Sequence, residues 1–325
     1  MTTDAPTTDV PPEGDELQRR AGLARFRIRG RGPSPMGPHT HLAERHETLT
    51  ALTWDRFDLT PQTPTIGAEI TGLDLEGPLD DPTIDEIRRA LLAHKVLVFR
   101  DQDLGVEGQL AFARRFGELE VHPFLAGADE TPELVHLAKD AAVGGYENIW
   151  HSDVTWRQQP ALGAVLRAVE VPDVGGDTLF ADMAAAYAGL DDDVRARIDG
   201  MTAVHDMALS FGQGLSGGDL AAARAAYPPA EHPVVRTHPE TGERILYVNA
   251  IFTDRIVGLG RDESEALLRH LFAQAEVPEI QYRLRWQPGT VAFWDNRATQ
   301  HYASSDYWPR RRVMQRAAIA GDRPA

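Results

Sequence analysis

The sequence contains no cysteine. Thiolate catalysis, disulfide bonds and cysteine-based zinc or iron–sulfur sites are therefore excluded, and a metal site has to be built from His, Asp and Glu. No apolar run approaches the roughly 18 residues of a membrane span, and the first residues lack the basic start and apolar core of a signal peptide. We therefore expect a cytoplasmic protein with no membrane partner.

Positive charge is also scarce. There are 33 Lys and Arg against 49 Asp and Glu, which gives a formal net charge of −16. This balance argues against a nucleic-acid partner, because phosphate binding needs a basic surface. The apolar content of 42% and charged content of 25% are typical of a globular protein, and 325 residues suffice for one large domain or two ordinary ones.

Composition divides the chain near residue 52. Residues 1–52 are rich in Pro, Gly, Thr and charge and have no sustained apolar period, so we predict a disordered or loosely attached extension. Its locally basic patch, residues 25–32, leaves open a strand with alternating Arg or a contact to an acidic partner. Residues 53–325 are predicted to form a single domain.

Short strands dominate the predicted secondary structure of this domain. Helices are expected at 80–95 (with Asp81 as candidate cap), 106–117, 183–198 and 262–274, and strands at 96–100, 162–169, 233–237, 245–249, 280–286, 290–294 and 311–319. Strands and helices do not alternate strictly, and no Gly-rich nucleotide loop is present, which disfavours a doubly wound fold. We predict a mainly β protein with flanking helices and a jelly-roll (double-stranded β-helix) core.

The stretch WHSDVTW (150–156) has the composition of a β-strand and carries a candidate metal site. In a strand, His151 and Asp153 would share a face, about 7 Å apart along the backbone. The pair alone is weak, since two polar residues on a solvated face would look the same. His301 can complete a two-His, one-carboxylate set, which is the arrangement of non-haem Fe(II) oxygenases. A similar pair, His238 and Glu240, is assigned to a solvent-facing hairpin tip and rejected.

The last predicted strand, RRRVMQRAAIA, places Arg312 and Arg316 on one face. Two inward-facing arginines are costly unless each meets an anion, and the planar guanidinium grips carboxylates and other oxyanions in a bidentate manner. We interpret them as anion-binding residues at the mouth of a barrel. The alternative is a surface salt bridge.

Several segments carry a family resemblance in conserved order and spacing along the chain from about Ile66 to the C-terminus. They are GAEITGLDL, FARRFGELEVHP, WHSDVTW, VPDVGGDTLFADM, HPVVRTHPETGERILYVN, FTDRIV and WDNRATQHYASSDYWPRRRVMQRAAIAGDRP. With these segments the sequence resembles the TauD/TfdA (taurine dioxygenase) family of Fe(II)- and 2-oxoglutarate-dependent dioxygenases.

The resemblance implies a double-stranded β-helix and a set of site residues. It implies that His151, Asp153 and His301 bind iron, and that Thr178 and Arg312 bind 2-oxoglutarate, with Arg312 on its distal carboxylate. Thr178 can alternatively be read as an ordinary strand-start residue.

For the substrate, the sulfonate-binding members imply that His122 and Arg316 contact an anionic head group. The remaining expected pocket residues are Asn148, Val154, Ser210, Phe211 and Phe252. A loop hydrogen-bonding role for His122 and a core role for the two phenylalanines remain open. Leu125 stands where taurine-specific members carry tyrosine, and Asn148 lies one position from their asparagine, so the segments look more like those of alkylsulfate and broad-sulfonate members.

We therefore expect a dioxygenase that uses Fe(II), 2-oxoglutarate and O2 to hydroxylate a C–H bond of a small organic anion. An alkyl sulfonate or alkyl sulfate would then yield an aldehyde and sulfite or sulfate, alongside succinate and CO2. One alternative keeps the chemistry with a carboxylate substrate, such as an aryloxyalkanoate or an amino-acid or natural-product acid. The other is a non-catalytic metal-binding β-helix protein. A homodimer or homotetramer is also left open.

Overall fold

The structure is a computed structural model that describes residues 39–125, 127–128 and 130–325. The basic patch at residues 25–32 lies outside these residues. Within the predicted extension, η1 (Thr40–Leu42) and α2 (Ala43–Thr50) are helical and bury Leu42 and Leu49. Arg45 also donates a hydrogen bond to the carbonyl of Ala93. The domain boundary at residue 52 stays a prediction.

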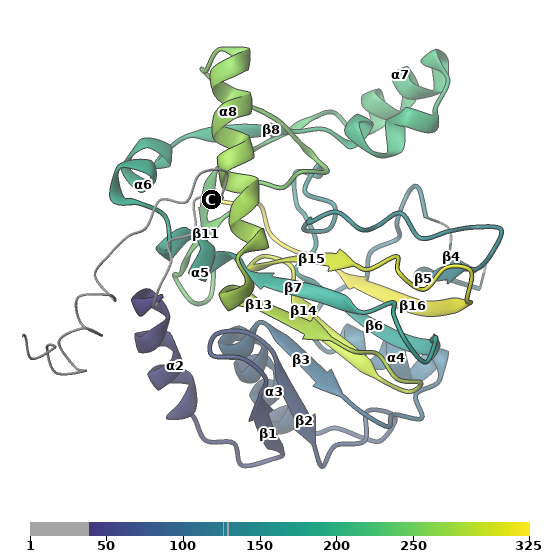
Figure 1. Cartoon of the computed structure of the whole chain (residues 1–325). Coiled ribbons are helices and arrows are strands. Elements are labelled where there is room, and N and C mark those ends of the chain that lie inside the picture. The colour runs from purple at the N-terminus through teal and green to yellow at the C-terminus, as the bar shows by residue number, and fades with distance from the viewer. Residues whose placement is uncertain (1–38, 126, 129) are drawn as a thin grey trace, which may run out of the picture.

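Two β-sheets form the centre of the molecule (Figure 1). The larger has the strand order β1 (Asp58–Pro61), β2 (Ala68–Thr71), β3 (Val96–Phe99), β14 (Val291–Asp295), β6 (Gly163–Glu170), β16 (Arg312–Ile319), β5 (Thr131–Lys139), β4 (Gly127–Ala128). The smaller has the order β13 (Gln281–Leu284), β7 (Thr178–Asp182), β15 (Thr299–Ala303). Apart from the parallel pair β2–β3, the neighbouring strands of both sheets run antiparallel.

The large sheet is buried on both faces, and β14 shows why its sequence is continuously apolar. Ala292 and Trp294 pack with Phe180 of β7, in a core between the two sheets. Val291 and Phe293 point the other way, into a core with the helices on the outer face. Successive strand residues alternate between faces, so a strand covered on both sides needs an apolar residue at every position. The facing sheets match the predicted jelly roll.

Helices α3 (Asp81–His94) and α4 (Val106–Arg114) cover the outer face of the large sheet. The side chain of Asp80, rather than that of Asp81, caps α3 by accepting a hydrogen bond of 3.0 Å from the amide of Thr83. The predicted cap is therefore one residue too late. Ile84, Ile87 and Leu91 follow helical spacing and are buried, as the sequence indicated.

The remaining elements extend from beside α2, where α5 and β11 lie, to the top of the molecule in Figure 1, where α7, α8 and β8 lie. They are β8 (Thr202–His205), β9 (Ala230–Pro233), β10 (Val235–Thr237), β11 (Arg244–Leu246), β12 (Thr253–Ile256), α5 (Met183–Ala188), α6 (Asp192–Ile198), α7 (Gly217–Ala226), α8 (Arg261–Phe272), η2 (Met207–Leu209), η3 (Phe211–Gly214), η4 (Ala273–Glu276) and η5 (Pro278–Ile280). The single helix predicted at 183–198 is wrong, because extended backbone at Asp191 separates α5 from α6. No helix in the described part of the chain has the length and apolar character to cross a membrane.

Candidate active site

His151 and His301 face each other across one rung of β-structure. The amide of His151 donates to the carbonyl of His301 at 3.0 Å, and the amide of His301 donates back at 2.7 Å. His301 belongs to β15, whereas the chain containing His151 leaves the ladder immediately afterwards. The backbone of the two segments therefore sets the distance between the two imidazoles.

The predicted strand at 150–156 is wrong beyond this rung. Residues 153–156 form a turn, and Val154 has a positive φ of 48°. Asn296 explains the departure: its side-chain oxygen accepts from the Asp153 amide at 2.7 Å, and its nitrogen donates to the Asp153 carbonyl at 3.0 Å. Because a side chain takes the backbone groups that a strand would offer to a neighbour, aromatic and β-branched content does not lead to a strand here.

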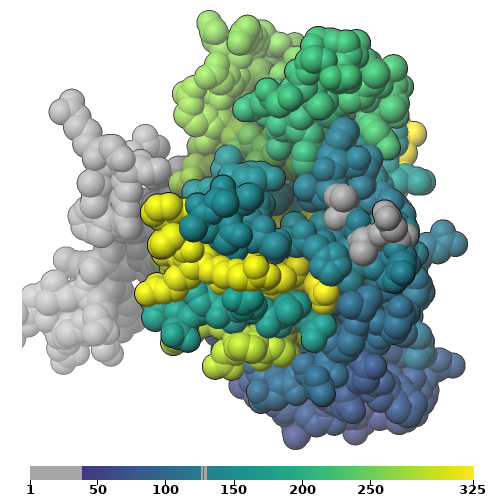
Figure 2. Space-filling model, turned by 90° about the vertical axis from the view of Figure 1, so that its right-hand side faces the viewer, coloured from purple at the N-terminus to yellow at the C-terminus, as the bar shows by residue number. Residues whose placement is uncertain are grey.

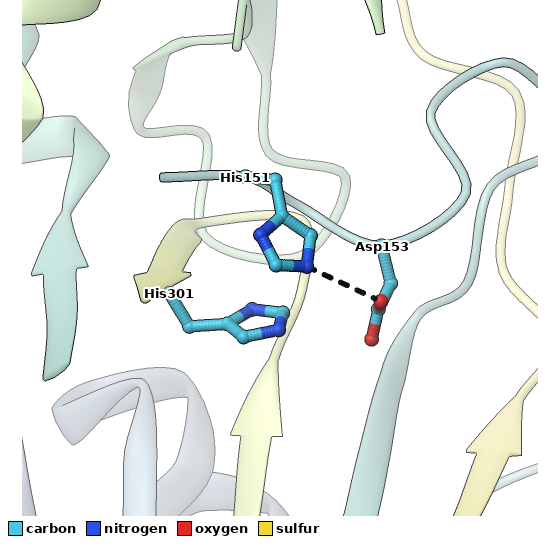
Figure 3. Close-up of side chains that lie close together, drawn as sticks. All are labelled: His151, Asp153 and His301. Carbon is cyan, nitrogen blue, oxygen red and sulfur yellow. Dashed lines mark ion pairs between the residues drawn. The ribbon is translucent and has the colours of Figure 1, made fainter. Parts of the chain in front are cut away.

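The three predicted ligands nevertheless converge, as Figure 3 shows. One ligand atom from each of His151, Asp153 and His301 lies within 4.8 Å of the others, and all three residues are buried. The Nε2 atom of His151 is 3.9 Å from Oδ1 of Asp153, and the two imidazole centroids are 4.2 Å apart. The convergence comes from a turn and a bridge, not from the i and i+2 positions of one strand.

The protonation states of the three groups fit a divalent metal. Burial lowers the pKa of His151, and burial together with His151 lowers the pKa of His301 to about 3, so both imidazoles are neutral. The Nδ1 of His151 lies 2.7 Å from the carbonyl of Ile149, which fixes the proton there and leaves Nε2 with a free lone pair. Burial alone would raise the pKa of Asp153, but the positive charge of Arg316 outweighs it and keeps the carboxylate ionised.

Arg316 lies directly against the metal-site carboxylate. Its Nη1 is 2.9 Å from both oxygens of Asp153, and its side chain is buried. The Nε of Arg316 has no hydrogen-bond partner within the described residues. A buried guanidinium with an unused donor can take up a further anion beside the metal site.

Arg312, four positions before Arg316 on the same face of β16, is buried and has no carboxylate partner in the described chain. Its Nε donates to the carbonyl of Gly176 at 3.1 Å, and no acidic side chain of the described chain lies within 4.0 Å. Burial lowers its pKa from the usual range. Thr178 begins β7 nearby and accepts a hydrogen bond of 2.9 Å from Nε1 of Trp286. The alternative interpretation of Arg312, a surface salt bridge, is thus not what the structure shows among the described residues.

One cavity of about 640 Å³ joins these groups. Eleven of the twelve residues predicted for the site line it: His122, His151, Asp153, Val154, Thr178, Ser210, Phe211, Phe252, His301, Arg312 and Arg316. Asn148 does not line it, although its neighbours Glu147 and Ile149 do.

The ring of His122 has both a loop role and a cavity role. Its Nδ1 accepts hydrogen bonds from the amides of Phe124 and Leu125 at 3.1 and 3.0 Å, as expected of a loop hydrogen-bonding histidine. Burial and the charge of Arg316 lower its pKa to about 4, so the ring is neutral and carries its proton on Nε2. The ring also lines the cavity.

Sequence reasoning missed several cavity residues and misplaced His238. Lys139, Tyr146 and Glu147 line the cavity, and their only advance signal was their position just before WHSDVTW. His238 is buried and its Nε2 lies 3.0 Å from Oδ2 of Asp295, so a solvent-facing tip was the wrong reason for rejecting it. Its partner Glu240 pairs with Arg88 and Arg297.

Comparisons with known proteins agree with this geometry. The family described as "Taurine catabolism dioxygenase TauD, TfdA family" matches residues 57–318. An alpha-ketoglutarate-dependent sulfate ester dioxygenase of Pseudomonas putida is 39% identical over 280 residues, covering 82% of this chain and 91% of that protein. An (S)-phenoxypropionate/alpha-ketoglutarate dioxygenase of Sphingobium herbicidovorans is 38% identical over 284 residues, covering 82% and 96%.

A solved structure confirms the fold. A taurine dioxygenase from Burkholderia xenovorans superposes with a TM-score of 0.72 at 38% identity, covering 83% of this chain and 91% of that one. The predicted jelly-roll core, the dioxygenase activity and the use of Fe(II), 2-oxoglutarate and O2 are thereby confirmed. The chain belongs to the TauD/TfdA family of Fe(II)- and 2-oxoglutarate-dependent dioxygenases.

Proposed function

We propose that this enzyme hydroxylates a C–H bond of a small organic anion whose sulfate or sulfonate group binds beside the metal. The observation that carries the proposal is the pair of buried arginines on one face of β16: Arg316 contacts Asp153, and Arg312 has no acidic partner among the residues that the structure describes. Two separate cationic positions in one cavity fit two separate anions, the co-substrate and the substrate.

In this proposal His151, Asp153 and His301 hold Fe(II). Two neutral imidazoles and one ionised carboxylate on one side of the metal leave positions open on the other. When bound, the iron and 2-oxoglutarate supply the oxidising chemistry: O2 is consumed, 2-oxoglutarate becomes succinate and CO2, and one oxygen atom enters the substrate. The protein contributes positioning and charge matching.

The co-substrate position is assigned to Arg312 and Thr178. The fixed contact of Arg312 Nε with Gly176 leaves its terminal nitrogens for a carboxylate, and the planar group binds such a partner in a bidentate manner. Thr178 lines the same cavity and supplies a hydroxyl.

The substrate position is assigned to Arg316 and His122, with apolar walls from Val154, Phe211 and Phe252. The neutral His122 ring donates through Nε2, which suits an oxyanion and spares the cost of burying a second full charge. Ser210 lines the same wall, whereas the role predicted for Asn148 stays a prediction. An apolar wall beside an anionic subsite suits an alkyl chain that ends in a sulfate or sulfonate. The similarity to the sulfate ester dioxygenase supports this choice.

A second candidate is the same reaction on an organic carboxylate. The similarity to the phenoxypropionate dioxygenase favours it, because a guanidinium at position 316 binds a carboxylate equally well. The non-catalytic alternative is not retained, since the family is one of dioxygenases. The cytoplasmic location and the dimeric or tetrameric state stay predictions.

The test is a product assay on purified protein with Fe(II), ascorbate and 2-oxoglutarate. Alkyl sulfates, alkyl sulfonates and aryloxyalkanoates are offered separately, and succinate, sulfate, sulfite and phenol are quantified. The proposal expects succinate to match sulfate or sulfite one to one. Phenol with succinate, and no sulfate or sulfite, would establish the carboxylate candidate. An Asp153→Ala protein with full turnover would refute the metal assignment.

A further inference from the structure

Lys139 lies beside Arg312 in the cavity, at a position that the proposed function does not use. Lys139 is the last residue of β5 and pairs with Arg312 of β16 in the antiparallel register. Directly opposed residues on one face of a sheet have Cβ atoms about 5 Å apart. Leu137 and Lys139 both line the cavity, so their shared parity places the lysine on the same face as Arg312.

The ammonium of Lys139 is buried and has one acidic partner. The residue is 8% exposed, and its Nζ lies 2.7 Å from Oε1 of Glu147 and 4.0 Å from the ring centre of Tyr146. In the described chain, Glu147 is the one carboxylate within 4.0 Å of this nitrogen. An ammonium carries three N–H donors, so further donors remain for an acceptor in the cavity.

Lysine is rare in this chain, which makes its position here informative. Lys95 and Lys139 are the only lysines among the 33 basic residues. Both are buried, and Lys95 pairs with Asp182 at 3.1 Å in the protein interior. The exposed basic residues are arginines, whereas both lysines are buried, at positions where the compact charge of an ammonium group fits.

Glu147 lies between the lysine and the groups of the active site. It lines the cavity, and its backbone carbonyl accepts a hydrogen bond of 3.3 Å from the amide of Ala303 in β15. The negative charge of Glu147 opposes the lowering of the pKa of Arg312 that burial causes, and it also acts to raise the pKa of His151. Burial alone would raise the pKa of Glu147, but the hydrogen bond and charge of Lys139 hold it below its usual range.

The residues that line this end of the cavity include two cations, Lys139 and Arg312, and one carboxylate, Glu147. Asp177 also acts on Arg312, but it is not part of the cavity lining and pairs with Arg283 at 2.7 Å. Figure 2 shows the C-terminal segment in yellow crossing this face of the molecule with teal chain on both sides. Lys139, Glu147 and Arg312 come from three separate segments and meet in the cavity. A bound carboxylate would balance the second positive charge at this end and could accept hydrogen bonds from both Lys139 and Arg312.

We propose that Lys139 is a second cationic residue for the distal carboxylate of 2-oxoglutarate, and that Glu147 is its counter-ion until the co-substrate binds. The inference rests on the proposed assignment of Arg312 to that carboxylate. When 2-oxoglutarate binds, the Lys139 ammonium moves from its contact with Glu147 alone to contacts with both Glu147 and the distal carboxylate. The paired cations then select 2-oxo acids that carry a distal carboxylate over those that end in a methyl group.

The experiment measures binding without turnover. Mn(II)-loaded full-length protein is titrated anaerobically by calorimetry with 2-oxoglutarate and with 2-oxovalerate, which has the same chain length and no distal carboxylate. The variants are Lys139→Met, Lys139→Arg and Glu147→Gln. Arg311→Met is the matched control, since it removes a positive charge next to Arg312 from an exposed side chain that pairs with Glu170.

We expect Lys139→Met to weaken 2-oxoglutarate binding about tenfold, the effect of losing one charge-assisted hydrogen bond, and to leave 2-oxovalerate binding unchanged. Lys139→Arg should retain most of the affinity, Arg311→Met all of it, and Glu147→Gln should bind 2-oxoglutarate more tightly than wild type. Glu147→Gln keeps the lysine and so tests the inference even where Lys139→Met does not fold.

Two outcomes overturn the inference. Lys139→Met with wild-type affinity, or with an equal loss for both 2-oxo acids, removes the lysine from the carboxylate site. Weaker or unchanged binding of 2-oxoglutarate by Glu147→Gln would show that Glu147 is not the counter-ion of Lys139. If Arg312 does not bind the distal carboxylate, Arg312→Leu would also leave 2-oxoglutarate binding unchanged. This variant therefore distinguishes a failure of the proposed function from a failure of the Lys139 inference alone.

Discussion

Asn296→Ala should lower both the stability of the protein and its affinity for metal. The Asn296 side chain is 1% exposed and makes three hydrogen bonds: with the amide of Asp153 at 2.7 Å, the carbonyl of Asp153 at 3.0 Å and the carbonyl of Ala161 at 3.1 Å. At about 1 kcal/mol for each hydrogen bond, the substitution should reduce the free energy of unfolding by about 3 kcal/mol. Since two of the bonds hold the turn that presents Asp153, metal affinity should fall roughly 10-fold or more.

The assay pairs urea unfolding with calorimetric titration of Mn(II). Gln102→Ala is the control, because its side-chain amide also makes three hydrogen bonds to backbone, with Leu73, Leu75 and Arg100, in a segment that contributes nothing to the cavity. Gln102→Ala should lose stability and keep wild-type metal affinity. Equal losses of metal affinity in the two variants, or none in Asn296→Ala, would refute the positioning role of Asn296.

Three further results are expected. His301→Ala should abolish succinate production and Mn(II) binding while the protein stays folded by circular dichroism; retained metal binding would contradict the ligand assignment. Arg316→Leu should raise the KM for the sulfated or sulfonated substrate at least tenfold and leave the binding of 2-oxoglutarate within a factor of two, and equal effects on both would argue against separate anion sites. His94 is buried, neither of its ring nitrogens has a hydrogen-bond partner in the described part of the chain, and burial lowers its pKa to about 4. Below about pH 6.5 the His94 side chain binds a proton in the unfolded chain but not in the folded protein, so this group lowers the free energy of unfolding by about 3 kcal/mol as the pH drops from about 6.5 to 4. In His94→Leu the free energy of unfolding should depend less steeply on pH over this range. An unchanged slope would refute the assignment.

The last strand was the part of the site that sequence predicted best. Strand parity alone placed Arg312 and Arg316 on one face, and the structure buries both in the cavity. The argument worked because β16 keeps an unbroken register with β5 from Arg312 to Ala317, and along such a stretch the side-chain direction follows from the residue number. The helix pattern of α3 succeeded for the same reason, with its cap misplaced by one residue.

Irregular segments were the part that sequence could not predict. The proposed ligands His151 and Asp153 were selected by residue type and spacing, yet the turn that presents Asp153 depends on Asn296, 143 positions later in the chain. Lys139 and Glu147 went unnoticed because a lysine and a glutamate separated by a loop have no periodicity. His238 resembled a loop residue until Asp295 supplied a buried partner. The turn at Asp153 and the burial of His238 both depend on a partner distant in sequence, and tertiary contacts of this kind override local preference.

The two ends of the cavity differ in the kind of backbone that carries them. Thr178, His301, Arg312 and Arg316 stand on strands of the two sheets, whereas His122, Val154, Phe211 and Phe252 stand on loops, turns and a 3-10 helix. Loops tolerate substitution, insertion and deletion far better than paired strands do. The strand-borne cavity residues can therefore persist through evolution while the apolar wall of Val154, Phe211 and Phe252 changes. A laboratory search for new substrates should diversify these three positions and leave the strands and the segment of His151 and Asp153 untouched.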